Sequence, residues 1–308
     1  MLNNINSKKV MKILLAVYAV IIVLGIAFSI FAGLRLDINF SGGARIAYSY
    51  SGNIKKADFE KNVKSVLGKT VFTVSQNEGF NGGSKTYAIN ISGKKSLDSD
   101  TQQKITESLE KKFAKNKIEL SESNSVSPSV AGGFFAKSMV AVALTAIFVV
   151  IYVGIRFKNI GGISAALTAL CALILDLAVT FAVCAVFRLQ IDSNYMAVVL
   201  TILGYSLNDT IVVYDRVREN KKYYPQLTIE DNMNKSISGV LVRNIVTSVT
   251  TVLAVITIIV VAELYGLTSL RTFGIPMAFG LLSGCFSSLF IAGPLWVCWK
   301  QRKSKKTA

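Results

Sequence analysis

The sequence predicts an α-helical polytopic membrane protein with six transmembrane helices, plus one α+β ferredoxin-like extracytoplasmic domain. Six apolar stretches are long enough to span a bilayer, which takes about 20 residues each. Between the first two stretches lies a segment of about 100 residues, the size of a small soluble domain. The 308-residue chain is 52% hydrophobic and carries a net charge of +16, which is typical of a membrane protein whose basic residues gather on one side.

The first apolar stretch is Ile13–Gly33, which follows three lysines, Lys8, Lys9 and Lys12. A secretory signal has a shorter apolar region, of about 7–15 residues. We therefore expect residues 1–34 to form a cytoplasmic N-terminus and an uncleaved transmembrane helix.

Residues 35–134 contain alternating and helical patterns in a recognisable order. Strand-like segments occur at Arg45–Tyr50, Thr70–Ser75, Lys85–Ile91 and from Lys117 to Val126, with a turn at Asn81-Gly82-Gly83. Helical spacing of apolar residues occurs over Lys55–Leu67 and Ser99–Ala114. The resulting order, β-α-β-β-α-β, predicts a ferredoxin-like head domain.

Five more spans are expected in a transmembrane bundle over residues 135–299, followed by a basic tail at 300–308. The spans are Ala136–Ile155, Ile160–Phe187, Ser193–Tyr214, Asn244–Ala262 and Thr272–Trp299. The cytoplasmic loop 215–243 has a capping-box pattern at Thr228 and Asp231, followed by Ile229, Met233, Ile237 and Val240 at helical spacing. This pattern indicates either an amphipathic helix on the membrane surface or a loop helix packed on the bundle.

The distribution of basic residues predicts the orientation. Sixteen Lys and Arg residues fall on the side that holds both termini, and only Arg188 and Arg271 fall in the short links on the opposite side. By the positive-inside rule, we expect a multi-pass membrane protein with both termini cytoplasmic and residues 35–134 extracytoplasmic; the family resemblance described below implies that the membrane is the bacterial cytoplasmic membrane. Most of this charge sets orientation and can contact anionic lipid.

Several functional classes are disfavoured. The chain has no histidine, which removes Ser-His-Asp and Cys-His catalysis and His-ligated metals. Its four cysteines lie in apolar stretches, and its Gly-Gly pairs fit no phosphate-binding loop. The Gly-x-Gly-Asp pattern of intramembrane aspartyl proteases is absent. We expect no enzyme activity, no cofactor, no metal site and no nucleic-acid binding.

Ionisable residues inside the spans are the candidate functional residues. Asp176 lies in the third span, Asp209 in the fourth, and Arg243 opens the fifth. A charged side chain at the bilayer centre costs about 2.5–3.5 kcal/mol on insertion scales, so such residues usually mark an ion or proton path. Asp209 and Arg243 have similar depths and could pair. The alternative for each residue is a structural ion pair or an interhelical hydrogen bond.

Other polar and small residues in the spans have two interpretations each. Thr247, Ser248, Thr250 and Thr251 either line a water path or bond back to carbonyls of their own helix. Gly280 and Gly284 form a G-x-x-x-G pattern that indicates close helix packing.

Three segments together resemble the SecD/SecF family of bacterial protein-export membrane proteins, on the side of its SecF-type subunits. They are Gly204–Asn220 (GYSLNDTIVVYDRVREN), Val242–Thr251 (VRNIVTSVTT) and Phe40-Ser41-Gly42-Gly43. The last segment resembles an Asp-Phe-x-Gly-Gly motif, and here Asn39 stands in place of its Asp. The residues that carry the resemblance are Phe40, Gly42, Gly43, Gly204, Tyr205, Asn208, Asp209, Thr210, Asp215, Arg216, Arg218, Glu219 and Asn220.

The resemblance implies a proton-driven transporter of the resistance-nodulation-division type. Its implied partners are a separate SecD chain, the SecYEG channel, the SecA motor indirectly, and the translocating preprotein. Asp209 and Arg243 carry over as a proton-pathway pair, and Asp176 is a further candidate from its position in a span. Two alternatives are a structural subunit that stabilises SecD without its own proton path, and a small-molecule exporter of the same superfamily.

Overall fold

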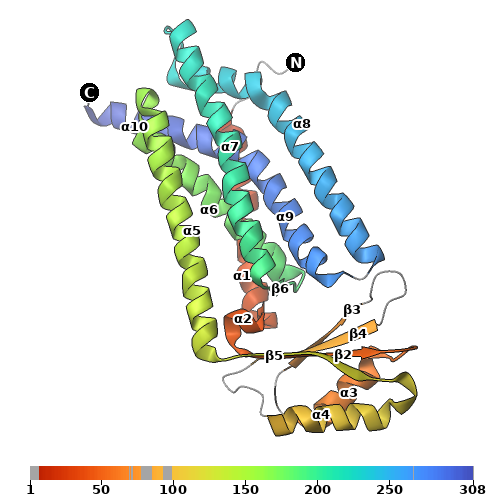
Figure 1. Cartoon of the computed structure of the whole chain (residues 1–308). Helices are drawn as coiled ribbons and strands as arrows, with labels where there is room; N and C mark the ends of the chain where they lie inside the picture. The colour runs from red at the N-terminus through yellow and green to blue at the C-terminus, as the bar shows by residue number, and fades with distance from the viewer. Residues whose placement is uncertain are drawn as a thin grey trace.

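A computed structural model of the chain describes residues 7–68, 70, 72–77, 85–92, 99–265 and 267–307. The predicted turn at Asn81-Gly82-Gly83 lies outside these residues. Six helical spans are long and apolar enough to cross a membrane, which confirms the predicted number within the described chain. Figure 1 shows the spans side by side, with both termini at one end and a small sheet domain at the other.

The first five spans are single helices: α1 (Ser7–Ala32), α5 (Pro128–Arg156), α6 (Gly162–Val186), α7 (Ser193–Tyr223) and α8 (Ile229–Leu264). The sixth span is divided into α9 (Thr268–Ser287), a π-helical segment η4 (Ser288–Ala292) and α10 (Gly293–Thr307). A π-helical turn inside a span often marks a functional position.

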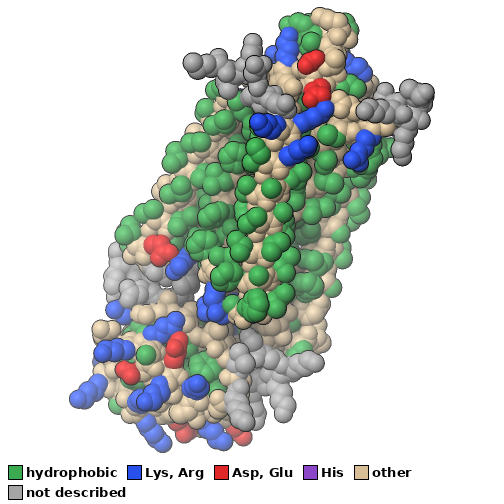
Figure 2. Space-filling view, turned by 180° about the vertical axis from the view of Figure 1, so that it is seen from behind, with side chains coloured by type: hydrophobic (Ala, Val, Ile, Leu, Met, Phe, Trp, Pro, Cys, Tyr) green, Lys and Arg blue, Asp and Glu red, His purple; other side chains and the backbone are tan. Residues whose placement is uncertain are grey.

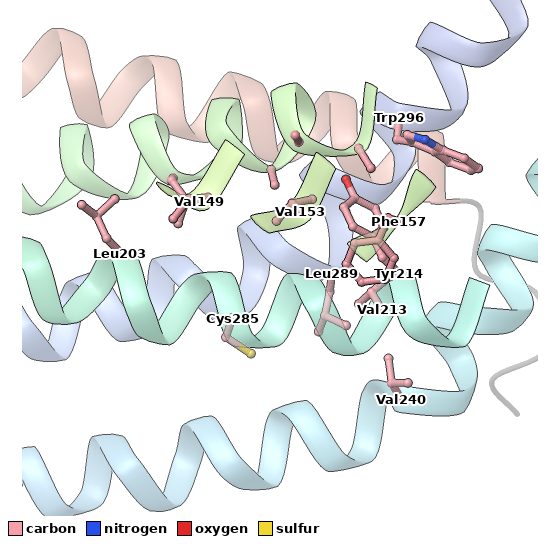
Figure 3. Packing of buried hydrophobic residues seen from close by; sticks show 14 of the residues in the cluster. Val149, Val153, Phe157, Leu203, Val213, Tyr214, Val240, Cys285, Leu289 and Trp296 are labelled. Atoms are coloured by element: carbon pink, nitrogen blue, oxygen red, sulfur yellow. The ribbon is translucent and has the colours of Figure 1, made fainter. Parts of the chain in front are cut away.

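The core of the bundle lies mainly between α5, α6, α7 and the sixth span. Buried side chains from these helices interlock, including Val153, Phe157, Tyr214 and Leu289 (Figure 3). In contrast, α1 and α5 leave most of their apolar side chains exposed. Figure 2 shows a broad hydrophobic face between two ends where Lys, Arg, Asp and Glu gather, as expected for a protein surrounded by lipid at mid-height.

The small domain consists of β2 (Gly43–Tyr50), α3 (Lys56–Leu67), β3 (Phe72–Asn77), β4 (Lys85–Ser92), α4 (Ser99–Lys112) and β5 (Glu119–Val126). Its sheet is antiparallel with strand order β3-β4-β2-β5, the order of a split β-α-β fold. Both helices cover one face (Figure 1). Phe59 of α3 stacks on Tyr87 of β4 at 4.5 Å between ring centroids.

The predicted boundary between residues 134 and 135 falls inside a helix, because α5 already begins at Pro128. The Ser127 side chain accepts a hydrogen bond from the Val130 N–H, and proline occupies the first turn. These are helix-start signals that do not depend on hydrophobicity. The apolar run therefore marks the membrane-embedded part of α5 and not its beginning.

A two-stranded parallel pairing connects the two parts of the molecule. The short strand β1 (Arg35–Leu36) pairs with β6 (Gln190–Ile191), which lies between α6 and α7. The bridge is extended by the Asp37 N–H, which donates to the Ile191 carbonyl at 3.0 Å, and by Gln190 Nε2, which donates to Asp37 Oδ1 at 3.0 Å. The start of α7 is thus fixed to the segment that leads into the head domain.

The link between α7 and α8 is shorter than predicted. Residues 215–223 continue α7, and residues 229–243 are the first part of α8, so no separate surface helix forms. Thr228 caps α8 as the pattern predicted, accepting a hydrogen bond from the Asp231 N–H at 3.1 Å. Met233, Ile237 and Val240 are buried, which agrees with the interpretation of a helix packed on the bundle. The first part of α8 lies across the end of the bundle before the helix turns along it (Figure 1).

Candidate functional site

The Asp176 carboxylate lies at the centre of a cluster of serine hydroxyls. Asp176 is fully buried on α6. Its Oδ1 accepts from Ser283 at 2.5 Å, and its Oδ2 accepts from Ser206 at 2.7 Å and from Ser287 at 2.8 Å. Three helices, α6, α7 and α9, therefore meet at one carboxylate. Hydrogen bonds to a charged group are among the stronger ones in proteins.

Further polar groups extend this cluster in two directions. The Tyr18 hydroxyl of α1 lies 2.9 Å from Ser283 Oγ and donates to the Ser283 carbonyl at 2.8 Å. Ser288, in the π-helical segment, donates to the Ser206 carbonyl at 2.9 Å and accepts from Thr210 Oγ1 at 3.0 Å. A connected chain of hydroxyls thus reaches from Asp176 to the residue next to Asp209.

Asp209 has a very different environment from Asp176. It is 3% exposed on α7, and its Oδ2 has no hydrogen-bond partner among the described residues. Two residues of α8, Asn244 and Ser248, likewise have a buried side-chain atom without a hydrogen-bond partner within the described residues, and Ser248 faces Asp209. Such a concentration is unusual, because most buried polar atoms are hydrogen-bonded.

Asp209 and Arg243, which the sequence suggested could pair, lie near each other but do not form an ion pair in the described structure. Arg243 is close enough to interact electrostatically with Asp209. However, no ion pair within 4 Å joins them in the described structure. The Arg243 side chain is exposed on the flank of α8. The carboxylate is thus inside the bundle and the guanidinium at its edge.

The threonines of α8 bond to their own helix. Thr247 donates to the Arg243 carbonyl at 2.9 Å, and Thr250 and Thr251 donate to carbonyls one turn earlier. This agrees with the second of the two interpretations given for these residues. The exception is Ser248, whose hydroxyl faces Asp209 and Cys285.

The glycines of the G-x-x-x-G pattern allow α9 to approach α7 closely. A Cβ atom at Gly280 would collide with Ile202, and one at Gly284 would lie 3.0 Å from Ser206 Cβ. This packing brings Ser283 and Ser287 within hydrogen-bond distance of Asp176. The pattern therefore has the packing role that the sequence indicated.

Polar contacts join the C-terminal part of α7 to α5 and to α8. Asp215 pairs with Arg218 at 2.9 Å and with Arg156 at 3.2 Å. Asn220 Nδ2 donates to Ser236 Oγ at 2.9 Å across the α7–α8 turn. Arg216 pairs with Glu219 at 2.6 Å on the exposed side. These motif residues have structural partners and do not approach either buried carboxylate.

The sequence is similar to known protein-export components. The family profile described as "Protein export membrane protein SecD/SecF, C-terminal" matches residues 105–302. The chain belongs to the SecD/SecF protein-export family.

Individual family members match over most of the chain. The protein translocase subunit SecF of Alicyclobacillus acidocaldarius is 32% identical, with 91% of this chain and 88% of the relative covered. The SecF of Borreliella burgdorferi is 33% identical, with 94% and 96% covered. SecDF of Bacillus subtilis is 32% identical, but the match spans only 36% of its length.

Solved structures of SecDF have the same fold. SecDF from Thermus thermophilus, described as a translocon-associated membrane protein, matches with a TM-score of 0.79 at 23% identity, over 97% of this chain and 39% of that one. A SecDF in a super-membrane-facing form matches with a TM-score of 0.66 at 22% identity, over 98% of this chain and 40% of that one.

The Phe-x-Gly-Gly segment in this SecD/SecF member lies where the head domain joins the bundle. Phe40 is in the short helix α2 (Ile38–Ser41) and packs edge-on against Phe134 of α5 at 5.1 Å. Gly42 has a φ of +71°, which favours glycine, and a Cβ atom there would lie in tight contact with Pro128, 3.1 Å from its Cα. Asn39, in place of the motif's Asp, donates to Asp37 Oδ2 at 2.7 Å. Asp37 therefore supplies a carboxylate two residues earlier.

Three other motif residues lie along the middle of α7. Gly204 and Asn208 are exposed on one face of the helix, and Tyr205 donates to Thr251 of α8 at 3.1 Å. Five hydroxyl residues around Asp176 were not predicted as functional from the sequence: Ser206, Ser283, Ser287, Ser288 and Tyr18. Their signal was available, since Ser283 and Ser287 are one helical turn apart in an otherwise apolar span.

Proposed function

We propose that this chain is a SecF-type subunit that works with a separate SecD chain and uses the proton-motive force to help draw preproteins across the cytoplasmic membrane. The assembly would act beside the SecYEG channel, with SecA contributing indirectly. Both termini would be cytoplasmic and the head domain would lie outside. The near-full-length match to SecF proteins and the match to about a third of SecDF support a division of the work between two chains.

The observation that carries the proton-coupling proposal is the buried, incompletely hydrogen-bonded Asp209 carboxyl group. An ionised carboxylate here lacks the hydrogen bonds that would replace its hydration. Protonation removes the charge without breaking a hydrogen bond at Oδ2. It would also release the nearby Arg243 from electrostatic attraction. Asp209 can therefore bind and release a proton with a change in the α7–α8 contact.

The energy available is sufficient for such a change. Moving one charge through 100 mV supplies about 2.3 kcal/mol. A two-state element with a gap of a few kcal/mol can be biased by that amount. The β1–β6 pairing supports a route for the motion, because it ties the start of α7 to the segment entering the head domain.

A partner chain would cover one polar face of the bundle. On α7, Thr201, Gly204 and Asn208 are exposed along one side. On α8, Arg243 and Thr247 are exposed as well. Arg and Asn are costly against hydrocarbon, whereas small and polar side chains favour helix–helix contacts in membranes. We assign this face to the membrane part of SecD.

The test is Asp209→Asn in the complex with SecD. We expect proton-motive-force stimulation of export to be lost, with assembly unchanged, because Asn cannot exchange a proton. Glu263→Gln is the matched control, since it likewise replaces a carboxylate by an amide, at an exposed ion pair with Arg271, and should leave stimulation intact. Normal stimulation in Asp209→Asn would refute the proposal.

A second candidate function is a structural subunit without its own proton path. The three hydrogen bonds at Asp176 favour this structural role, because that carboxylate already connects α6 to α7 and α9. Proton flux into vesicles that contain SecD with the wild-type or Asp209→Asn chain separates the two. Equal flux in both preparations supports the structural subunit.

A further inference from the structure

A basic cavity lies at the end of the bundle that carries both termini. Its volume is about 580 Å³, within the range of small-ligand sites. It is formed where α5 passes into α6 through the turn η3 (Lys158–Ile160), where α7 ends, and where α10 runs alongside. Among the described residues, three lysines line it, Lys158, Lys221 and Lys300, and no acidic residue does so.

No described carboxylate neutralises the ammonium groups of these lysines. None of them has a carboxylate within 4 Å in the described structure. Lys221 Nζ donates to the Asn159 carbonyl at 3.2 Å, which holds it across the cavity. The nearby carboxylate of Glu230 is occupied by Lys8 at 2.5 Å and by Gln301 at 3.3 Å. Three positive charges thus line one cavity, and the described residues supply no counter-ion for them.

Trp296 provides an independent observation of an unfilled donor. It lines the same cavity and is only 4% exposed. Its indole nitrogen has no hydrogen-bond partner among the described residues. Figure 3 places Trp296 at the edge of the packed cluster, beyond Tyr214. A buried indole N–H usually finds an acceptor, and an acceptor in this cavity would complete it.

The start of α6 adds a third contribution. Gly161 lines the cavity and precedes the first residue of α6, which has no side-chain cap. The N-terminus of a helix carries partial positive charge and free N–H groups, which favour anions. Gly161 has a φ of +96°, and a Cβ atom there would collide with the Lys300 ammonium group. Glycine therefore lets Lys300 lie against the helix start.

We propose that this cavity binds the headgroup phosphate of an anionic phospholipid from the adjoining leaflet. Lysines and an indole N–H are donors suited to a phosphodiester, and the partial positive charge of a nearby helix start favours its negative charge. The cavity lies at the membrane-proximal ends of the spans, where lipid headgroups are concentrated, and Tyr224, Leu227 and Ile229 line it and can contact the glycerol and upper acyl chain. Basic pockets between helix ends are typical sites for anionic lipid headgroups.

The test is lipid binding to the purified full chain in detergent, followed by native mass spectrometry during titration with phosphatidylglycerol. Phosphatidylcholine and inorganic phosphate serve as comparison probes. We expect phosphatidylglycerol to bind at least tenfold more tightly than phosphatidylcholine, and millimolar phosphate not to displace it. Equal binding of the two lipids, or displacement by phosphate alone, would overturn the assignment to an anionic lipid.

Matched variants locate the site. Lys300→Gln is expected to weaken phosphatidylglycerol binding about fivefold, the effect of one basic residue near a lipid surface. Trp296→Phe should weaken it several-fold by removing one donor to a charged group. Lys222→Gln makes the same charge change next to Lys221, outside the cavity, and should have no effect. An equal loss in Lys222→Gln and Lys300→Gln would refute a specific site.

A further variant guards against misfolding. Lys158→Gln alters an exposed side chain, so it should preserve the melting temperature in lipid-free detergent and still weaken binding about fivefold. Unchanged binding in a folded Lys158→Gln protein would contradict the proposal. Because the readout is lipid binding and not export, its outcome is independent of the proposed translocase function.

Discussion

The Ser206 hydroxyl on α7 donates a 2.7 Å hydrogen bond to the Asp176 carboxylate on α6. Only three residues further along α7, Asp209 has a buried oxygen without a partner in the described chain. Within a single turn, α7 therefore carries one residue, Ser206, that is hydrogen-bonded to Asp176, and another, Asp209, that has a carboxyl oxygen without a partner among the described residues. The hydrogen bonds around Asp176 fix α7 against α6 and α9. A change in the protonation of Asp209 would therefore act mainly on the side of α7 that faces α8.

The serine cluster predicts a measurable contribution to stability. Ser283→Ala should destabilise the bundle by about 0.6–1.7 kcal/mol, the range for interhelical hydrogen bonds in membranes. Asp176→Ala should cost more, because it removes the acceptor that three buried hydroxyls share. Unfolding of the full chain in detergent measures both. Ser193→Ala, at an exposed position, is the control, and an equal effect there would argue against the cluster.

Close packing of α9 on α7 predicts that Gly284 tolerates no larger residue. A Cβ atom at Gly284 would already lie 3.0 Å from Ser206 Cβ, and overpacking typically costs about 1–3 kcal/mol. Gly284→Val should lower the melting temperature and disturb the Asp176 cluster. Gly133→Val is the control, since nothing lies within 4 Å of a Cβ atom there. Equal melting temperatures for the two variants would show that the contact is loose.

The N-terminal end of α7 predicts a pH dependence of stability. Burial, together with the charge of Asp37, raises the pKa of Asp192. Because the folded state holds this proton more tightly, its stabilising contribution is complete below the unfolded pKa, about 3.9. It is lost as the pH rises through the higher folded pKa. At pH 7 the ionised group therefore destabilises the fold.

Asp192→Asn should accordingly raise the melting temperature at pH 7, with a gain that shrinks towards pH 4. The substitution keeps the helix cap, because Asn can accept from the Tyr195 N–H as Asp192 does at 3.0 Å. Thermal unfolding of the full chain across this pH range measures the gain. Glu119→Gln, at an exposed carboxylate, should give no such trend. A gain in Asp192→Asn that grows on acidification would contradict the assigned sign.

The exposed face of α7 predicts a variant that affects association alone. Gly204→Leu should leave the melting temperature of the isolated chain almost unchanged, since nothing lies within 4 Å of a Cβ atom there. It should weaken co-purification with SecD, because small residues permit close helix approach. Gly132→Leu, also uncrowded but on α5, should not. Undiminished co-purification of Gly204→Leu would remove this face from the interface.

Hydropathy and strand periodicity were sufficient to predict most of the architecture. The six spans follow from uninterrupted apolar length, and β2 to β5 from alternation and turn residues, because both signals are local in the chain. The ends of helices were less predictable. Pro128 and Tyr223 are terminal residues of helices that extend beyond their apolar runs, where capping and packing decide the length. The continuity of α8 with the link before it depended on burial of Met233 and Ile237.

The sequence by itself determined that Asp176, Asp209 and Arg243 would lie in or near the membrane, because their flanking residues are apolar. Only the tertiary structure decided that Asp176 is enclosed by serines from two other helices, whereas Asp209 has an unpartnered oxygen and no ion pair with Arg243 within the described chain. The reason is physical. A carboxylate's partners come from side chains that are distant in sequence, and their approach depends on how closely Gly280 and Gly284 let the helices pack.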